Sequence, residues 1–169
     1  HQAVAATLNE AIYKPLREAW PETKCSNYST SECFVVSQGA SGEKCSSTTQ
    51  VFADMMAPVF YSTEKWISPG VARTQQNWQM LTVSASMERL SQLRACSDRP
   101  IVPWIHLPGQ KHKNNLRTTP DLTKELIHRA HQTYGIDEWI IWSDEQTALR
   151  IESWNSLHEA IVNSYGQEQ

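Results

Sequence analysis

The chain has 169 residues, of which 40% are hydrophobic and 20% charged, so it is long enough to bury the core of a single domain, 1–169. Its formal net charge is -3 at pH 7, and its basic residues are spread along the chain, which argues against nucleic acid and anionic membranes as partners. No stretch of the sequence reaches the roughly 18 apolar residues that a membrane span needs.

The first part of the chain predicts a helix, a strand and a long loop. Apolar residues recur at three- and four-residue steps over 8–20, which favours an opening helix that restarts near Pro15 and ends at Pro21. The first predicted strand is Thr23–Tyr28. A polar, glycine-containing loop without periodicity then extends to about Gln50, and loops of this length in compact domains are often functional.

The middle of the chain alternates strands with helical spacing. The second predicted strand lies in Met55–Tyr61, an apolar run suited to burial on both faces of a parallel sheet, although Pro58 removes one backbone donor. The apolar spacing over 69–95 predicts one broken helix or two. The third predicted strand is Ile101–His106.

The last part of the chain carries the clearest helix signals. Thr119 is a good cap, Pro120 suits the first helical position and Gly135 is a good stop, which predicts a helix that ends at Tyr134. The fourth predicted strand is Asp137–Trp142. The final helix has a single apolar stripe, made of Ile151, Trp154, Leu157, His158, Ile161, Val162 and Tyr165.

Strands separated by helices favour parallel pairing and an α/β fold. We expect parallel βα units that form a partial or half TIM (β/α)8 barrel, equivalent to its C-terminal half. Four strands alone leave open edges and an open apolar interior. The sequence allows three solutions: a longer protein supplies the missing N-terminal half, a second chain completes the barrel, or the sheet is open and flavodoxin-like.

The predicted strands end in polar or aromatic residues, whose side chains suit hydrogen bonding to a polar ligand and stacking on it. These ends read Ser26-Asn27-Tyr28, Phe60-Tyr61-Ser62, Trp104-Ile105-His106 and Trp142-Ser143-Asp144-Glu145. Successive strands of a parallel barrel supply an active-site face in this way. The candidate ligand contacts are therefore Asn27, Tyr28, Tyr61, His106 and Trp142.

A resemblance to a known family is carried by four segments: Asn27-Tyr28, Ala57–Tyr61, Arg99–Ile105 and Ile140–Ser143. They resemble the C-terminal half of a glycoside hydrolase barrel of the hyaluronidase type. The resemblance implies that Tyr28, Tyr61 and Trp142 line a sugar subsite and that the substrate is a polysaccharide or glycan. The acidic pair of that family lies on the strand before this region, and no corresponding D-x-E segment precedes the first segment here.

Glycoside hydrolysis needs two facing carboxyl groups, with aromatic rings beneath the sugar. Glu145 and Asp144 directly follow a predicted strand, so Glu145 is the candidate acid/base and Asp144 the candidate hydroxyl ligand. An acidic pair at this position also suits a helix N-terminus. The first hypothesis is a carbohydrate-active domain, a glycoside hydrolase. The alternatives are a noncatalytic carbohydrate-binding or interaction domain of open α/β fold, or an unrelated α/β domain whose aromatic strand ends are core.

The tryptophans and cysteines give secondary expectations. Trp20, Trp78 and Trp154 lie within helical patterns and are expected in the core. The four cysteines show no C-x-x-C spacing, so no zinc or thioredoxin motif is indicated. A disulfide between Cys33 and Cys45 would fit an oxidising or extracellular compartment, whereas free thiols would fit the cytosol.

We expect neither a metal nor another cofactor. His128 and His131 have i, i+3 spacing on a predicted helix, but no third ligand is near them in the sequence, so they favour a solvated helix face. No glycine-rich phosphate loop and no G-x-S-x-G motif are present, which leaves nucleotide binding and hydrolase triads unsupported.

Overall fold

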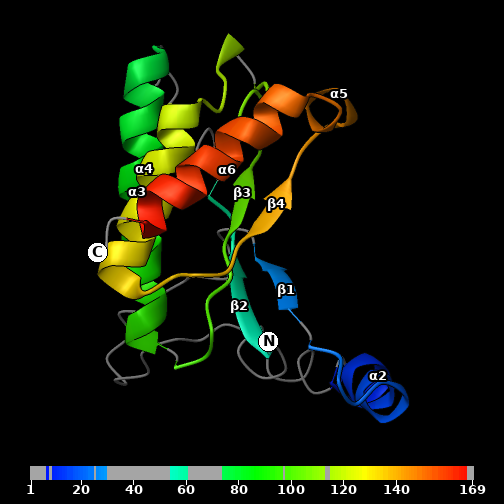
Figure 1. Ribbon diagram of the computed structural model, residues 1–169. Helices are drawn as coiled ribbons and strands as arrows, with labels where there is room; N and C mark the ends of the chain where they lie inside the picture. The colour runs from blue at the N-terminus through cyan, green and yellow to red at the C-terminus, as the bar shows by residue number, and fades with distance from the viewer. Residues whose placement is uncertain are drawn as a thin grey trace.

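The computed structural model describes residues 7, 9–24, 26–29, 54–60, 74–96, 98–112 and 115–166. Its elements in chain order are the π-helical turn η1 (Asn9–Tyr13), α2 (Lys14–Ala19), β1 (Ser26–Ser29), β2 (Met55–Pro58), α3 (Gln75–Cys96), β3 (Trp104–His106), α4 (Pro120–Tyr134), β4 (Ile140–Trp142), α5 (Glu145–Ala148) and α6 (Ile151–Tyr165). α3 separates β2 from β3 and α4 separates β3 from β4, which confirms the predicted α/β class (Figure 1). Within these described ranges, none of the helices combines the length and hydropathy of a membrane span.

The described strands pair in parallel, as predicted. β1 pairs with β2, and β3 pairs with β4 in a register that sets Trp104 opposite Ile140 and His106 opposite Trp142. Parallel bridges from Met56 to Ile101 and from Val59 to Trp104 connect these two pairs. The strands therefore follow one another in chain order, and their carboxyl ends lie along one edge.

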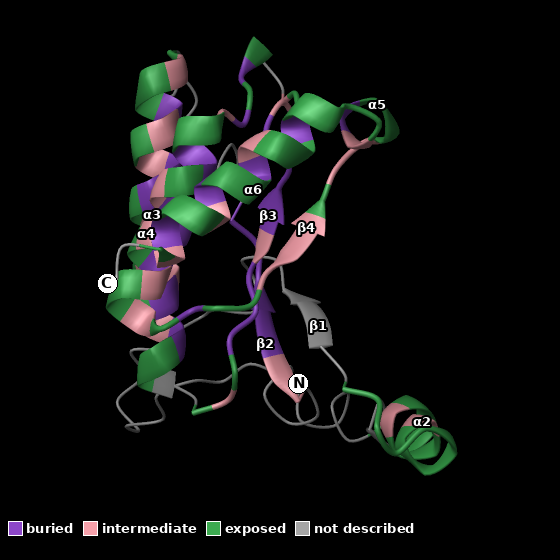
Figure 2. Cartoon of the chain, viewed as in Figure 1, coloured by how far each residue is buried: buried purple, intermediate pink, exposed green. Residues whose placement is uncertain are grey.

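The long helices α3, α4 and α6 pack together against the strands (Figure 1). Figure 2 shows that β2 and β3 are largely buried, whereas β4 is partly exposed. The core joins strand and helix residues in one cluster, which includes Met56, Phe60, Trp78, Leu90, Leu93, Ile105, Leu107, Leu126 and Ile127. Removal of their apolar surface from water is the main favourable contribution to folding.

The ends of α4 lie where the sequence predicts them. The Thr119 side chain accepts a hydrogen bond from the N–H of Leu122, and Pro120 occupies the first turn, where its missing N–H costs no helical bond. Gly135 ends the helix with a left-handed φ of 61°, a conformation that favours glycine. Because each of these signals is local, the sequence was sufficient to define both ends.

Other predicted elements have different bounds. The described part of 69–95 is one continuous helix, α3, rather than a broken helix or two, since no glycine or proline interrupts it after residue 74. The predicted strand Ile101–His106 shortens to β3, with Ile101 paired only through an isolated bridge, because Pro103 lacks a backbone donor. β4 is likewise limited to the last three residues of Asp137–Trp142.

The predicted apolar stripe of α6 is wrong in part. Its buried face is formed by Ser153, Leu157, Ala160 and Ser164, whereas Ile151 is 66% exposed and Val162 50% exposed. Leu157 of the predicted stripe is therefore buried and Ile161 and Tyr165 pack against the core, whereas Ile151 and Val162 lie outside the buried face.

Two of the three core predictions for tryptophan are also wrong. Trp78 is 1% exposed, as expected for core, but Trp20 is 61% exposed and Trp154 is 43% exposed. α2 has no buried residue, so the apolar spacing before Trp20 does not face a core among the described residues. Trp154 instead lies on the surface of α6, where its Nε1 donates to the carbonyl of Ala148.

Several predictions fall outside the described residues. They concern the polar loop up to Gln50 with Cys33 and Cys45, and the candidate ligand contact Tyr61. For Asn27 and Tyr28, the structure describes the backbone of β1 only.

Replacing the cap residue, Thr119→Ala, should lower the free energy of unfolding by about 1 kcal/mol, because the first turn of α4 loses a side-chain acceptor. The same hydroxyl also accepts from Gln79 on α3, so the change removes a link between the two helices. Urea unfolding followed by circular dichroism measures the effect. Thr133→Ala, at an exposed position of α4, is the matched control and should be close to neutral. Equal losses in the two variants would contradict the capping role.

Candidate functional site

A stack of four aromatic side chains lies at the carboxyl ends of β3 and β4. The ring centroids are 4.9 Å apart for Trp142 and His106, 4.7 Å for His106 and His112, and 4.8 Å for His112 and Trp78. These separations are typical of favourable aromatic contacts. Trp142 is 44% exposed and Trp78 is fully buried, so the stack runs from the surface to the core.

The register of the sheet brings together two of the predicted ligand contacts. His106 and Trp142 are opposite one another in parallel strands, and paired residues project to the same side of a sheet. Ile105 and Ile141 alternate with them and pack in the core with the helices. The His106 and Trp142 side chains therefore project from the other side, where the Trp142 ring is open to solvent.

The loop after β3 folds back as a hairpin and adds a second histidine, His112, to the stack. The N–H of Gly109 donates to the Thr118 carbonyl at 2.8 Å, and the N–H of Thr118 donates to the Gln110 carbonyl at 2.9 Å. This pairing sets His112 beside His106, with 3.3 Å between His106 Nδ1 and His112 Nε2. His112 Nε2 also lies 2.8 Å from the Thr118 hydroxyl.

Gly109 is required where this hairpin meets the helices that follow β4. Its φ is 95°, in the region that favours glycine, and a Cβ at this position would lie 3.1 Å from the Ser153 hydroxyl of α6. The same Cβ would lie 3.6 Å from a methyl carbon of Thr147 on α5. The absence of a side chain at Gly109 thus lets the loop after β3 pack closely on α5 and α6.

Both histidines are held neutral. Burial lowers the pKa of His106 to about 3, with a further lowering by His112 and an opposing effect of Asp144. Burial also lowers the pKa of His112 to about 4. At neutral pH each ring therefore has one N–H donor and one acceptor nitrogen, the pattern that can hydrogen-bond to hydroxyl groups.

Asp144, a predicted hydroxyl ligand, caps α5. Its Oδ1 accepts from the N–H of Thr147 at 2.8 Å, and its Oδ2 accepts from Gln110 Nε2 at 2.7 Å. The backbone bond from Thr147 lowers the pKa of Asp144, and the bond from Gln110 and the charge of Arg150 lower it further. Asp144 is therefore ionised at neutral pH and both of its oxygens are engaged in holding the loop.

Glu145, the predicted acid/base, is the first residue of α5 and is exposed. It lies three residues after Trp142, and its carboxylate also suits the positive end of the short helix. The structure thus keeps Glu145 at the same edge as the aromatic stack, while its neighbour Asp144 forms the cap.

Gln110 is the residue of the site that the sequence did not reveal. It is 5% exposed, and its side-chain amide bonds to the loop after β4 through both Asp144 and Ser143. The available signal was a glutamine directly after Pro108-Gly109; its burial, which requires hydrogen-bond partners for the side-chain amide, is seen only in the structure. That signal becomes specific only when the partner loop is known.

β1 contributes its backbone to the same edge. Asn27 lies opposite Met56 and Tyr28 lies opposite Ala57 in the parallel pairing with β2. The carboxyl end of β1 therefore has the same direction as those of β3 and β4, which is the arrangement that the predicted sugar subsite requires.

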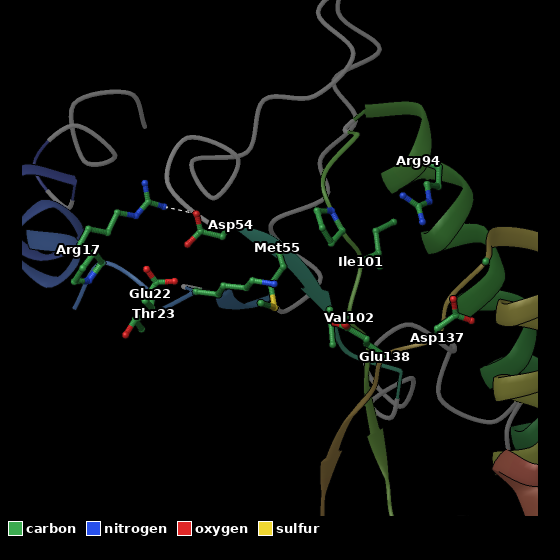
Figure 3. A pocket seen from close by; sticks show the side chains of 14 residues that line it. Arg17, Glu22, Thr23, Asp54, Met55, Arg94, Ile101, Val102, Asp137 and Glu138 are labelled. Atoms are coloured by element: carbon green, nitrogen blue, oxygen red, sulfur yellow. Dashed lines mark hydrogen bonds and ion pairs between the residues drawn. The ribbon is translucent and has the colours of Figure 1, made fainter.

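A separate cavity of about 660 Å³ opens at the amino ends of the strands (Figure 3). Arg17 of α2 reaches Asp54 there, with 2.7 Å between Nη2 and Oδ1. Asp137 and Glu138, which precede β4, contribute further charges to the lining. In parallel α/β sheets, ligands bind outside the carboxyl ends of the strands, and this cavity lies at the opposite ends. We therefore place the candidate site at the aromatic stack.

The stability of the protein should depend on pH through the neutral histidines. Their pKa values are lower in the folded state than the ordinary 6.5, so the unfolded chain binds more protons between about pH 6.5 and 4. The contribution of the two histidines to stability should be complete above pH 6.5. The free energy of unfolding should fall as the pH decreases through this window, by up to about 1.4 kcal/mol per pH unit for each histidine.

Urea unfolding at several pH values between 7.5 and 4 measures this dependence. His106→Gln should flatten the curve, and His158→Gln, at an exposed position of α6, should leave its shape unchanged. A curve of unchanged slope in His106→Gln would show that this histidine is not held neutral by the fold.

Among the described residues, no group of three or more His, Cys, Asp or Glu side chains is arranged to hold a metal ion. Comparison with known proteins found no family model that matches the chain and no curated protein with significant similarity to it. The functional assignment of this chain therefore depends on its own residues and their geometry.

Proposed function

We propose that this chain is a carbohydrate-active α/β domain of glycoside hydrolase type, which binds a polysaccharide or glycan at the carboxyl edge of β3 and β4. The observation that carries the proposal is the exposed ring of Trp142, held at this edge against His106 with ring centroids 4.9 Å apart. Sugar rings have apolar faces that stack on aromatic side chains, and their hydroxyl groups need hydrogen-bonding partners nearby.

The surroundings of Trp142 meet both needs. His106 is buried and both histidines are neutral, so they support the Trp142 ring without placing a positive charge beside it. Ser143, next to Trp142, adds a hydroxyl at the same edge and is fixed by bonds to Gln110 and to the Asp144 carbonyl. Because the Trp142 ring packs against His106, it loses little conformational entropy when a ligand binds to its other face.

The finer assignment of the fold, a partial (β/α)8 barrel, is part of the proposal. The strand pairs connect in chain order, which is the order of barrel strands and differs from the flavodoxin-like order in which the first two strands exchange places. The proposal is supported by the position of the segments that resemble hyaluronidase-type barrels, since their described residues lie on β1, β2, β3 and β4 or directly beside them. Tyr28 and Tyr61 would then complete the sugar subsite with Trp142.

The partner favoured by this arrangement is a further βα segment, from an N-terminal half or from a second chain. Within the described residues β4 pairs only with β3, and the adjacent helix α6 exposes Ile151, Trp154 and Val162. A neighbouring strand would pair with the open edge of β4, and a neighbouring helix would cover this apolar surface. Sedimentation of the chain with and without such a segment measures the association.

Hydrolysis would require an acid that reaches the glycosidic oxygen, and Glu145 is the candidate for this role. A second candidate function, noncatalytic carbohydrate binding, is favoured by one observation: both carboxylate oxygens of Asp144 are engaged in the loop. An acid pair made of Asp144 and Glu145 would have to break the cap of α5, whereas binding to Trp142 leaves it intact.

Trp142→Ala should weaken binding of an oligosaccharide at least about tenfold, equivalent to about 1.4 kcal/mol, because the stacking platform is lost. The loss of folding stability should stay small, since the ring is already 44% exposed. Isothermal titration with a hyaluronan tetrasaccharide and with neutral chitotetraose measures the affinity. Trp20→Ala, which removes an even more exposed ring at the end of α2, is the control and should bind normally. Outright unfolding of Trp142→Ala would make Trp142 a core residue and exclude the site.

Glu145→Gln separates the two candidate functions. If the chain hydrolyses glycans, loss of the acid should lower kcat by about 10²–10⁴-fold with the affinity retained. Reducing-end assays on the same oligosaccharides, with the barrel-completing segment present, measure the rate. Glu152→Gln, at an exposed position of α6, is the matched control. Binding without any hydrolysis in the wild type would support the noncatalytic function instead.

A further inference from the structure

We propose that Gln110 is the positioning residue of this site, a side-chain amide that fixes the loop after β3 to the loop after β4 so that the histidine pair and Trp142 form one binding surface. The inference rests on the proposed carbohydrate-binding function. It concerns how the surface is held, because Gln110 is buried beneath the loops and is assigned no contact with the sugar.

The Gln110 side chain uses both its N–H groups and its carbonyl oxygen to hold the two loops. Nε2 donates to Asp144 Oδ2 at 2.7 Å and to the Lys111 carbonyl at 3.2 Å. Oε1 accepts from the backbone N–H of Asp144 at 2.8 Å and from the Ser143 hydroxyl at 3.3 Å. The Ser143 hydroxyl has one proton, which it shares between Gln110 Oε1 and the Asp144 carbonyl at 3.0 Å. The position therefore requires both a donor and an acceptor, which glutamine supplies in one side chain.

The backbone of Gln110 joins the other half of the site. Its carbonyl accepts from the N–H of Thr118, whose hydroxyl lies 2.8 Å from His112 Nε2. Its side chain holds Asp144 and Ser143, which directly follow Trp142. One residue thus connects the support of His112 with the residues that fix the end of β4, and the His106 ring lies between the two.

The contact between Gln110 and Asp144 specifically requires a donor at Nε2. A carboxyl group in place of the amide would, when ionised, place two like charges at hydrogen-bond distance, which is strongly unfavourable. When protonated, the same group would again offer a donor to Asp144 Oδ2. The charged and titratable groups around this contact are Asp144 itself, Arg150 and His106, with His112 beside His106.

The decisive variant is therefore Gln110→Glu, with Gln146→Glu on the exposed surface of α5 as the matched control for added charge. The affinity for a hyaluronan tetrasaccharide and for chitotetraose is measured by titration calorimetry between pH 7.5 and 5. Gln110→Glu should bind at least about tenfold more weakly at pH 7.5 and recover much of that loss at pH 5, where the two carboxyl groups share a proton. Gln146→Glu should bind like the wild type, with no recovery of its own.

Wild-type affinity for Gln110→Glu at pH 7.5 would overturn the proposal, and so would a loss that persists unchanged at pH 5. The first result would mean that the contact does not position the site, and the second that any change at this position is disruptive. Thermal unfolding of each variant at both pH values shows that the compared proteins are folded.

A second measurement does not depend on a ligand. Gln110→Met keeps the length of the side chain and removes its polar atoms, so the pKa of Asp144, followed by carboxyl ¹³C NMR, should rise relative to the wild type because one donor is lost. An unchanged pKa of Asp144 would overturn the role of Gln110 even if no oligosaccharide bound. Absence of oligosaccharide binding to the wild type, with a raised pKa in the variant, would instead refute the carbohydrate function and leave the loop contact established.

Discussion

The parallel hydrogen bonding between β2 and the chain around β3 is the constraint on which the rest of the structure depends. The N–H of Val102 donates to the Met56 carbonyl at 2.8 Å, and the N–H of Phe60 donates to the Trp104 carbonyl at 2.9 Å. These bonds satisfy backbone groups that are buried beneath the helices, where an unpaired group would cost free energy. They also join the strand pairs, so the carboxyl ends of β3 and β4 form one edge with those of β1 and β2.

The chemistry of that edge follows from how its loops are buried. The hairpin after β3 encloses His106 between Trp142 and His112, and burial keeps both imidazoles neutral. Asp144 remains charged at the same edge because Thr147 and Gln110 supply its hydrogen bonds. A neutral aromatic stack beside a fixed carboxylate is a surface for a polar, uncharged group with an apolar face, which is the basis for proposing a sugar ligand.

Local signals in the sequence were sufficient for part of the fold. The ends of α4 and the alternation of strands and helices were predicted because caps, stops and apolar runs act within a few residues. The sequence did not predict that α3 is continuous or that β3 is short. Apolar spacing alone does not show whether a helix is interrupted or how far strand pairing extends. The buried face of α6 also depended on how the helix packs against α4, which the apolar spacing alone did not show.

The sequence by itself determined that aromatic and polar residues follow the strands, and parallel pairing was enough to infer that His106 and Trp142 come together. Only the tertiary structure decided what supports them. His112 is brought into the stack by a hairpin, Asp144 becomes a cap, and Gln110 links loops separated by more than thirty residues. Such contacts depend on how distant segments pack, because a side-chain amide or imidazole has no fixed role until its partners are in place.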